Sequence, residues 1–389
     1  MGACGSGLAV SSPLQATGAD GLGKAWLLDG GGVLEFGSAV DIERNPNAEK
    51  QFTSSSAGAP ARVGFSCRRG VKRGDALPNQ DAWGVYLVPE NLAAFGVFDG
   101  HGEKGHWISE LVKGTLLKGI AQHSVSSVDP TPAVKQWYRQ VHRTMCSNPK
   151  LGAMHSGTTA TVVVHDVKRG RLVVSHVGDS KAVLLKQSGK KLVAEALTRD
   201  HRPELHEDMG GESGKECYDL YTALERERIT RMGGSIVYDG RCHRVSWPGG
   251  DVSLNMSRSL GDAVAHDACG VSEECDLRVH RLCHTDKAII IGSDGMWDVI
   301  SPQEAASIVS EFAPERAMDA ARRLADEAVT RWYMQTEGRV VDDTTVLIAW
   351  LPALAPPGTA VAAAPAVPAC QDRLAHEGEH KSPISPEAV

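Results

Sequence analysis

Aspartates stand in this sequence where runs of apolar, strand-forming residues begin or end. An antiparallel sheet places the end of one strand beside the start of the next, so acids at such positions can converge on one edge. Carboxylates that crowd together repel one another, and divalent cations relieve that repulsion. All-oxygen ligation suits Mg²⁺ or Mn²⁺ better than Zn²⁺. The acids at these positions are Asp81, Asp99, Asp179, Asp294, Asp342 and Asp343.

Each of these acids has a simpler explanation when it is taken singly. Aspartate often forms turns because its side chain bonds nearby amides, and both Asp99 and Asp294 are followed by glycine. The set as a whole favours a metal site instead. His101 lies two residues after Asp99, and beside a metal site a histidine can donate a proton to a leaving oxygen.

The apolar runs next to the acids have the length and composition of short strands. Residues 92–98, 287–292 and 344–350 are dense in β-branched or aromatic residues. Four further candidates follow one another with only short turns between them, so we expect successive antiparallel hairpins. These four are 159–165, 171–177, 181–186 and 191–195.

Helical periodicity is found at 107–116 and 134–145. A capping box with proline in the first turn begins a third helix at Ser301, and Pro314 separates it from a fourth that reaches about Trp332. Strands and helices occur in blocks without strict alternation. This order predicts an α+β fold in which antiparallel sheets form a sandwich flanked by helices.

Size and charge limit what the chain can be. It has 389 residues, of which 42% are hydrophobic and 23% charged, so it can bury a full core. Its net charge of −7 argues against nucleic acid as a partner. No apolar run approaches the roughly 18 to 20 residues of a membrane span, and the N-terminus has no secretory pattern. We therefore expect a cytoplasmic protein.

The nine cysteines include no C-x-x-C pair, which is typical of free thiols in a reducing compartment. A zinc site is the weaker alternative, because the spacing of the candidate ligands matches no zinc module. Those candidates are Cys269, Cys275, Cys283 and His284.

Composition divides the chain into three parts. Residues 1–58 are rich in Gly, Ser and Ala without a sustained period, which predicts a flexible, disordered arm. Residues 59–352 form the expected folded domain. Residues 353–389 are first rich in Ala and Pro and then polar, which predicts a disordered C-terminal tail.

The first six residues, MGACGS, fit the pattern for N-myristoylation at Gly2. One acyl chain binds a membrane weakly, and no basic residue precedes Lys24, so palmitoylation of Cys4 would have to supply a second anchor. The alternative is a leader of small residues that happens to fit a permissive pattern. The acylation hypothesis predicts a protein tethered to the cytosolic face of a membrane.

Eight motifs, in order, resemble those of the metal-dependent type 2C serine/threonine protein phosphatases, the PPM family. They read PNQDAW at 78–83, FGVFDGHG at 95–102, SGTTA at 156–160, VGDSKAVL at 177–184, LTRDHRP at 197–203, MSRSLGD at 256–262, SDGMWDVIS at 293–301 and DDTTV at 342–346. The resemblance covers about residues 60–352. It implies an αββα sandwich, two antiparallel β-sheets flanked by helix pairs, with a binuclear Mn²⁺ or Mg²⁺ centre at one end.

The resemblance also implies roles for individual residues. Asp99 would bridge the two ions, and His101 would be the general acid. Asp179, with Asp294 and Asp298, would hold a weaker third ion. The metal ligands implied in this way are Asp81, Asp99, the carbonyl of Gly100, Asp179, Asp294 and Asp342.

The implied reaction is hydrolysis of phosphoserine and phosphothreonine in proteins by direct attack of a metal-bridging water. Two other readings remain: a catalytically dead relative that serves as a binding module, and a two-metal phosphohydrolase of nucleotides or small phosphates. The presence of Asp99, Asp294 and Asp342 favours an active enzyme. We expect it to be a monomer.

Three features depart from the common pattern of the family. Gln80 stands where many members have glutamate and others glutamine, and the neutral amide removes one negative charge, so we expect lower affinity for one ion. Lys72 or Arg73 could bind the substrate phosphate, or could simply belong to a solvated basic loop. Residues 206–221 form an insertion rich in glycine and acids, which we expect to be a mobile loop that biases substrate docking. The segment 238–251 is a second candidate for selectivity.

Overall fold

Two antiparallel sheets built from short apolar strands form the centre of the structure, a computed structural model that describes residues 26–27, 34–37, 62–71, 78–88, 91–203, 220–246 and 253–352. The five-stranded sheet has the order β10-β9-β15-β16-β3. Its strands are β3 (Arg62–Arg68), β9 (Lys181–Ser188), β10 (Lys191–Ala196), β15 (Asp286–Gly292) and β16 (Thr344–Trp350).

The nine-stranded sheet has the order β1-β2-β4-β5-β7-β8-β14, and a short ribbon of β6 and β13 joins the end of β5. Its strands are β1 (Trp26–Leu27), β2 (Leu34–Gly37), β4 (Asp81–Val88), β5 (Leu92–His101), β6 (Gly157–Thr158), β7 (Ala160–Asp166), β8 (Arg171–Val177), β13 (Leu260–Gly261) and β14 (Asp276–Arg281). The predicted strands at 92–98, 287–292 and 344–350 are confirmed, and β5 continues to His101.

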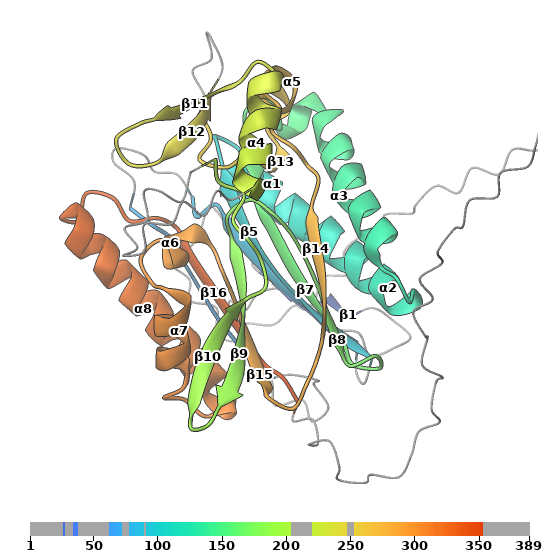
Figure 1. Cartoon of the computed structure of the whole chain (residues 1–389), viewed down its shortest axis with the longest axis vertical. Coiled ribbons are helices and arrows are strands. Elements are labelled where there is room, and N and C mark those ends of the chain that lie inside the picture. The colour runs from blue at the N-terminus through green and yellow to red at the C-terminus, as the bar shows by residue number, and fades with distance from the viewer. Residues whose placement is uncertain are drawn as a thin grey trace, which may run out of the picture. The chain divides into compact units, whose positions relative to one another are not determined.

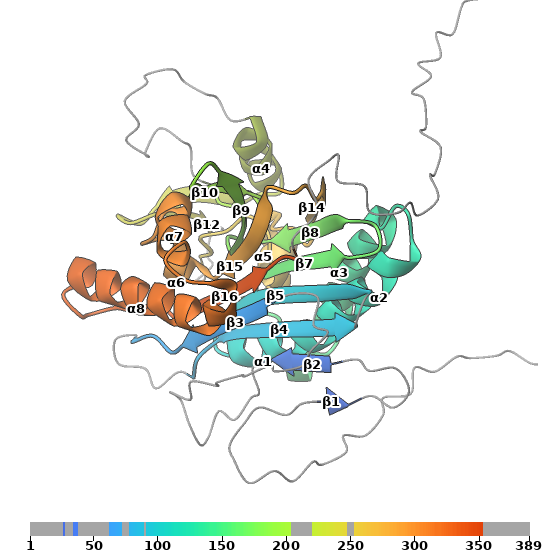
Figure 2. The same cartoon turned by 90° about the horizontal axis from the view of Figure 1, so that it is seen from below.

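Helices cover the outer face of each sheet (Figures 1 and 2). Those on the nine-stranded sheet are α1 (Gly105–Val112), a π-helical segment (Lys113–Leu117), α2 (Lys118–Ser126) and α3 (Thr131–Cys146). Those on the five-stranded sheet are α6 (Asp294–Trp297), α7 (Pro302–Val309) and α8 (Ala317–Thr336). The capping box at Ser301 is present as expected. The predicted αββα sandwich is therefore confirmed.

The remaining elements lie beyond these layers. Helix α4 (Leu220–Arg231), helix α5 (Ala263–Cys269) and a hairpin of β11 (Ser235–Tyr238) and β12 (His243–Ser246) cluster at one end of the sandwich in Figure 1. In the described part of the chain, no helix is long and apolar enough to cross a membrane.

Apolar side chains form one buried layer between the sheets and one beneath each group of helices. Phe65 of β3 and Trp83 of β4 stack in the middle layer, with ring centroids 3.7 Å apart. This contact joins the two sheets directly. Burial of these two rings and of the surrounding aliphatic side chains stabilises the sandwich.

The expected hairpin between β8 and β9 is wrong. Strand β8 pairs with β7 and β14, whereas β9 pairs with β10 and β15, so the turn at 178–180 crosses from one sheet to the other. Both strands are apolar on both faces, with one face in the layer between the sheets and the other toward the helices. The hydrophobic pattern of β8 and β9 therefore could not indicate which strands they pair with. The crossing places Asp179 at the end of the sandwich.

Strands β1 and β2 come from residues 1–58, for which the sequence predicts a flexible arm, and β2 pairs with β4. The rest of that arm, including Gly2 and Cys4, lies outside the described residues, as does the tail 353–389.

Candidate metal centre and active site

Asp81 and Asp99 face each other on neighbouring strands. Asp81 is the first residue of β4, Asp99 lies near the end of β5, and the two are direct partners across the antiparallel pair. Residues directly opposite each other in such a pair have side chains on the same face of the sheet. The two carboxylates therefore lie at one end of the nine-stranded sheet.

The five-stranded sheet contributes the other acids. Asp294 follows β15, and Asp342 precedes β16. Ser293 links the two sheets, because its Oγ donates to Asp81 Oδ2 at 2.7 Å and accepts from the amide of Thr345 at 2.9 Å. The acids thus converge at one end of the sandwich from both sheets, and not along one edge of a single sheet as the sequence suggested.

Asp343 fixes the backbone around this end of the sandwich. Its Oδ1 accepts from the amide of Gly70 at 2.7 Å, and its Oδ2 accepts from the amide of Gln80 at 2.9 Å. Gln80 directly precedes Asp81 and Asp343 directly follows Asp342. These two bonds therefore bring the start of β4 to the start of β16.

Neighbouring carboxylates raise the pKa values of Asp81, Asp99 and Asp294, as expected for acids that share one site. Burial raises the pKa of Asp99, and the charges of four neighbouring carboxylates raise it further: Asp81, Asp294, Asp342 and Asp179. Burial also raises the pKa of Asp294, and nearby carboxylates add to this effect. The pKa of Asp81 rises from 3.8 to about 7, chiefly through burial and then through Asp343. Cations would remove this repulsion.

The donor atoms of this site fit Mg²⁺ or Mn²⁺. Oδ1 of Asp81 and Oδ1 of Asp179 are buried and have no hydrogen-bond partner in the described part of the chain. Two other groups, His142–His266–Glu273 and His176–His201–Asp276, bring three potential ligand atoms within 4.8 Å of one another; the aspartates are not so tightly grouped.

Arg202 lies among the three acids that sequence reasoning assigned to a third ion. Its Nε is 3.0 Å from Asp179 Oδ2, and its Nη2 is 2.8 Å from Asp298 Oδ1 and 3.6 Å from Asp294 Oδ2. The structure therefore brings Asp179, Asp294 and Asp298 together around one guanidinium. Sequence reasoning missed Arg202, although the motif LTRDHRP contains it.

His101 is the last residue of β5, and its side chain remains partly exposed. Its Nε2 lies 2.7 Å from Oδ2 of Asp262. Sequence reasoning gave Asp262 no role, although it closes the motif MSRSLGD. A histidine held by a carboxylate next to a cluster of acids can donate a proton to a substrate oxygen.

A sequence profile described as Protein phosphatase 2C matches residues 85–209 and 218–335. The chain belongs to the protein phosphatase 2C family. It is therefore a metal-dependent serine/threonine protein phosphatase of the kind that uses Mn²⁺ or Mg²⁺. The resemblance drawn from the motifs is confirmed.

Two curated relatives of this phosphatase come from plants. The chain is 32% identical over 308 residues to "Probable protein phosphatase 2C 48" of Oryza sativa subsp. japonica, which covers 71% of this chain and 81% of the relative. It is 31% identical over 311 residues to "Probable protein phosphatase 2C 73" of Arabidopsis thaliana, with coverage of 72% and 77%.

Solved structures support the fold. A serine-threonine phosphatase 2C from Toxoplasma gondii has a TM-score of 0.60 at 22% identity, covering 79% of this chain and 98% of that one. A C. elegans sex determining protein has a TM-score of 0.58 at 21% identity, covering 76% of this chain and 65% of that one.

Gln80 supports the backbone of the phosphatase site through its amide. Its Nε2 donates to the carbonyl of Gly102 at 2.5 Å, a bond that an ionised glutamate could not make. Its own carbonyl accepts from the amide of Gly100 at 3.1 Å and from Ser109 Oγ at 2.7 Å. Gln80 thus holds the loop on both sides of His101.

Other predicted site residues fall elsewhere. Lys72 and Arg73 lie outside the described residues, as does the insertion apart from its last two residues. The alternative zinc site is wrong: Cys269 and Cys275 lie in different hydrophobic clusters, and Cys283 is exposed.

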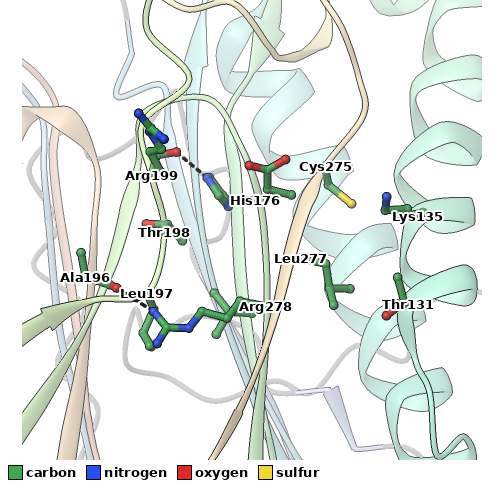
Figure 3. A pocket seen from close by; sticks show the side chains of 12 residues that line it. Thr131, Lys135, His176, Ala196, Leu197, Thr198, Arg199, Cys275, Leu277 and Arg278 are labelled. Carbon is green, nitrogen blue, oxygen red and sulfur yellow. Dashed lines mark hydrogen bonds between the residues drawn. The ribbon is translucent and has the colours of Figure 1, made fainter. Parts of the chain in front are cut away.

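A cavity of about 470 Å³ lies between α3, β8 and β14 (Figure 3). Lys135 and Arg278 are among its lining residues, and Arg278 donates to the carbonyl of Ala196 at 3.0 Å. None of the aspartates that converge from the two sheets lines this cavity. It is therefore separate from the candidate metal centre.

Removing the charge of Asp81 should stabilise the metal-free phosphatase, and more so at high pH. The raised pKa means that folded Asp81 keeps a proton that the unfolded chain has released, so between about pH 4 and pH 7 stability falls as pH rises. Asp81→Asn keeps an oxygen that can accept from Ser293. In EDTA, Asp81→Asn should melt at a higher temperature than wild type, and this difference in melting temperature should grow by several degrees between pH 5 and pH 8. A constant difference would contradict this.

Proposed function

We propose that Asp99, the carbonyl of Gly100, Asp294 and Asp342 hold a pair of Mn²⁺ or Mg²⁺ ions, with Asp81 as an inner or supporting acid. The observation that carries the proposal is the convergence of Asp81 and Asp99 from one sheet with Asp294 and Asp342 from the other, and the charges of the other three raise the pKa of Asp99. The partnerless oxygen of Asp81 supports it, since a buried carboxylate oxygen needs a cation or a donor. The ions would supply an ionised water and offset charge on the phosphoryl oxygens.

His101 is the proposed general acid. It would protonate the serine or threonine oxygen as that oxygen leaves phosphorus. No protein nucleophile is required in this scheme. Sγ of Cys67 lies 4.0 Å from the carbonyl oxygen of Asp81, and burial raises the pKa of this thiol to about 12, so it remains protonated at neutral pH.

Lys72 and Arg73 are proposed to bind the substrate phosphate. They directly follow Val71, which exchanges two backbone hydrogen bonds of 2.8 Å with Val341. Val341 in turn precedes Asp342. Val71, the residue before Lys72, therefore pairs with the residue before the proposed ligand Asp342, and the positive charge of Lys72 and Arg73 suits a phosphate.

Asp99→Asn tests the metal proposal through catalysis. The neutral amide cannot neutralise two cations, so kcat on a phosphothreonine peptide in Mn²⁺ should fall by at least about 100-fold. Asp319→Asn, on the partly exposed side of α8, is the matched control and should keep the wild-type rate. Equal kcat values for wild type and Asp99→Asn would contradict the proposal.

Arg202 is proposed to compete with a third cation for Asp179, Asp294 and Asp298. Arg202→Met keeps the apolar stem but removes the guanidinium that contacts the three carboxylates. The weakest Mn²⁺ site should then tighten by about tenfold in a calorimetric titration, because one competing charge has gone. Arg278→Met removes an arginine that pairs with Glu195 instead, and should leave the titration unchanged. An unchanged or weaker site in Arg202→Met would contradict the competition.

The N-terminus is proposed to carry myristate on Gly2 and palmitate on Cys4, which would tether the phosphatase to the cytosolic face of a membrane. The support is the sequence MGACGS alone.

Gly2→Ala removes the acceptor of the myristoyl group. The wild-type protein should sediment with the membrane fraction of cells, and Gly2→Ala should move to the supernatant. Cys4→Ser should bind more weakly than wild type, since one chain holds only marginally. Unchanged sedimentation of Gly2→Ala would refute the acylation hypothesis.

A further inference from the structure

His101 and Asp262 form a short hydrogen bond in which the carboxylate is buried and is held by a second donor. The Nε2···Oδ2 distance is 2.7 Å, and the side chain of Asp262 is only 3% exposed against 22% for His101. The same Oδ2 also accepts from Ser259 Oγ at 2.6 Å. The carboxylate is therefore fixed from one side by Ser259 and holds the imidazole on the other.

Three short strands place the two residues together. At the end of β5, His101 pairs with Gly157 of β6, and Gly157 pairs with Gly261 of β13. Asp262 directly follows Gly261. The ribbon therefore brings Asp262 across from His101, although the two are 161 residues apart in the chain.

The backbone is shaped to leave room for the pair. A Cβ on Gly157 would lie 2.0 Å from Oδ2 of Asp262 and 2.8 Å from Nε2 of His101. Any larger residue at 157 would force the two side chains apart. Glycine is therefore required at this position.

Asp262 itself has a left-handed backbone, with φ 47° and ψ 42°. This conformation is uncommon for residues other than glycine, although aspartate and asparagine adopt it more readily than most. Two backbone bonds of 3.0 Å maintain it, from the amide of Asp262 to Ser156 and from that of Ala263 to Ala153. Strain of this kind persists where the surrounding structure enforces it, often at functional sites.

We infer that Asp262 is a positioning residue for proton donation by His101. It holds Nε2 of the imidazole and so fixes which way the ring turns toward the departing serine or threonine oxygen. Asp262 does not touch the substrate and acts only through His101. This inference rests on the proposed role of His101 as the general acid.

The leaving group distinguishes this role from a merely structural one. A threonine alkoxide is a poor leaving group and depends on protonation, whereas 4-nitrophenolate departs as a stable anion. A positioning residue for the proton donor should therefore matter far more for a phosphothreonine peptide than for 4-nitrophenyl phosphate.

Asp262→Asn is the first test variant, because asparagine tolerates the left-handed backbone. In Mn²⁺, its kcat on the phosphothreonine peptide should fall by about 100-fold, while kcat on 4-nitrophenyl phosphate falls several-fold at most. KM and the affinity for Mn²⁺ should stay at wild-type values. His101→Gln should likewise lose more kcat on the phosphothreonine peptide than on 4-nitrophenyl phosphate. The double variant His101→Gln/Asp262→Asn should be no slower than His101→Gln alone.

Ser259→Ala provides a second variant in case Asp262→Asn folds poorly. It removes one bond to Asp262 and should give a smaller loss with the same dependence on the leaving group. Equal losses on both substrates in folded variants, or additive losses in the double variant, would overturn the inference. A His101→Gln enzyme that loses equal activity on the phosphothreonine peptide and on 4-nitrophenyl phosphate would also overturn the inference. If wild type releases phosphate from neither substrate, the proposed function fails instead.

Discussion

Repulsion among buried carboxylates is the constraint on which the rest of this phosphatase depends. Asp81 and Asp99 come from one sheet, and Asp294 and Asp342 from the other, so the acids meet only when the two sheets are packed in register. The raised pKa values of Asp81, Asp99 and Asp294 indicate that folding brings these acids together at an electrostatic cost. The metal ions used by the family offset that cost, so cation binding and stability are linked.

The apolar layers of the sandwich provide the rigidity that this arrangement needs. The Phe65–Trp83 stack joins the sheets, and helices bury the outer face of each one. Direct polar links then fix the end of the sandwich: Ser293 bonds Asp81, and Asp343 bonds the amides of Gly70 and Gln80. The acids are thus attached to strand ends whose positions the core determines.

The positive charges around the acids have different roles. Arg202 is a fixed internal cation that contacts Asp179 and Asp298, so part of the repulsion is offset by the protein itself. The pKa of Asp99 is raised by burial and by the carboxylates around it, and this acid fits the ions of the family. His101 stands at the border of this region, paired with Asp262 and partly exposed to solvent.

Much of the fold could be predicted from the sequence, because β-branched runs such as 344–350 form strands wherever they are buried. The motifs also indicated the family and the convergence of acids. The partners of β8 and β9 could not be predicted, since both strands are apolar on both faces. Arg202 and Asp262 could not be given roles because their partners lie 96 and 161 residues away in the chain. Only the fold brings such pairs together.

Electron paramagnetic resonance of the Mn²⁺-loaded protein tests the central claim most directly. If the strand-end aspartates share a pair of ions about 3.5 to 4 Å apart, loading with about two equivalents should give the spectrum of spin-coupled Mn²⁺. The coupled signal should be lost in Asp99→Asn, the variant that lacks the proposed bridging carboxylate. Isolated, uncoupled Mn²⁺ at every loading of the wild-type protein would contradict the account.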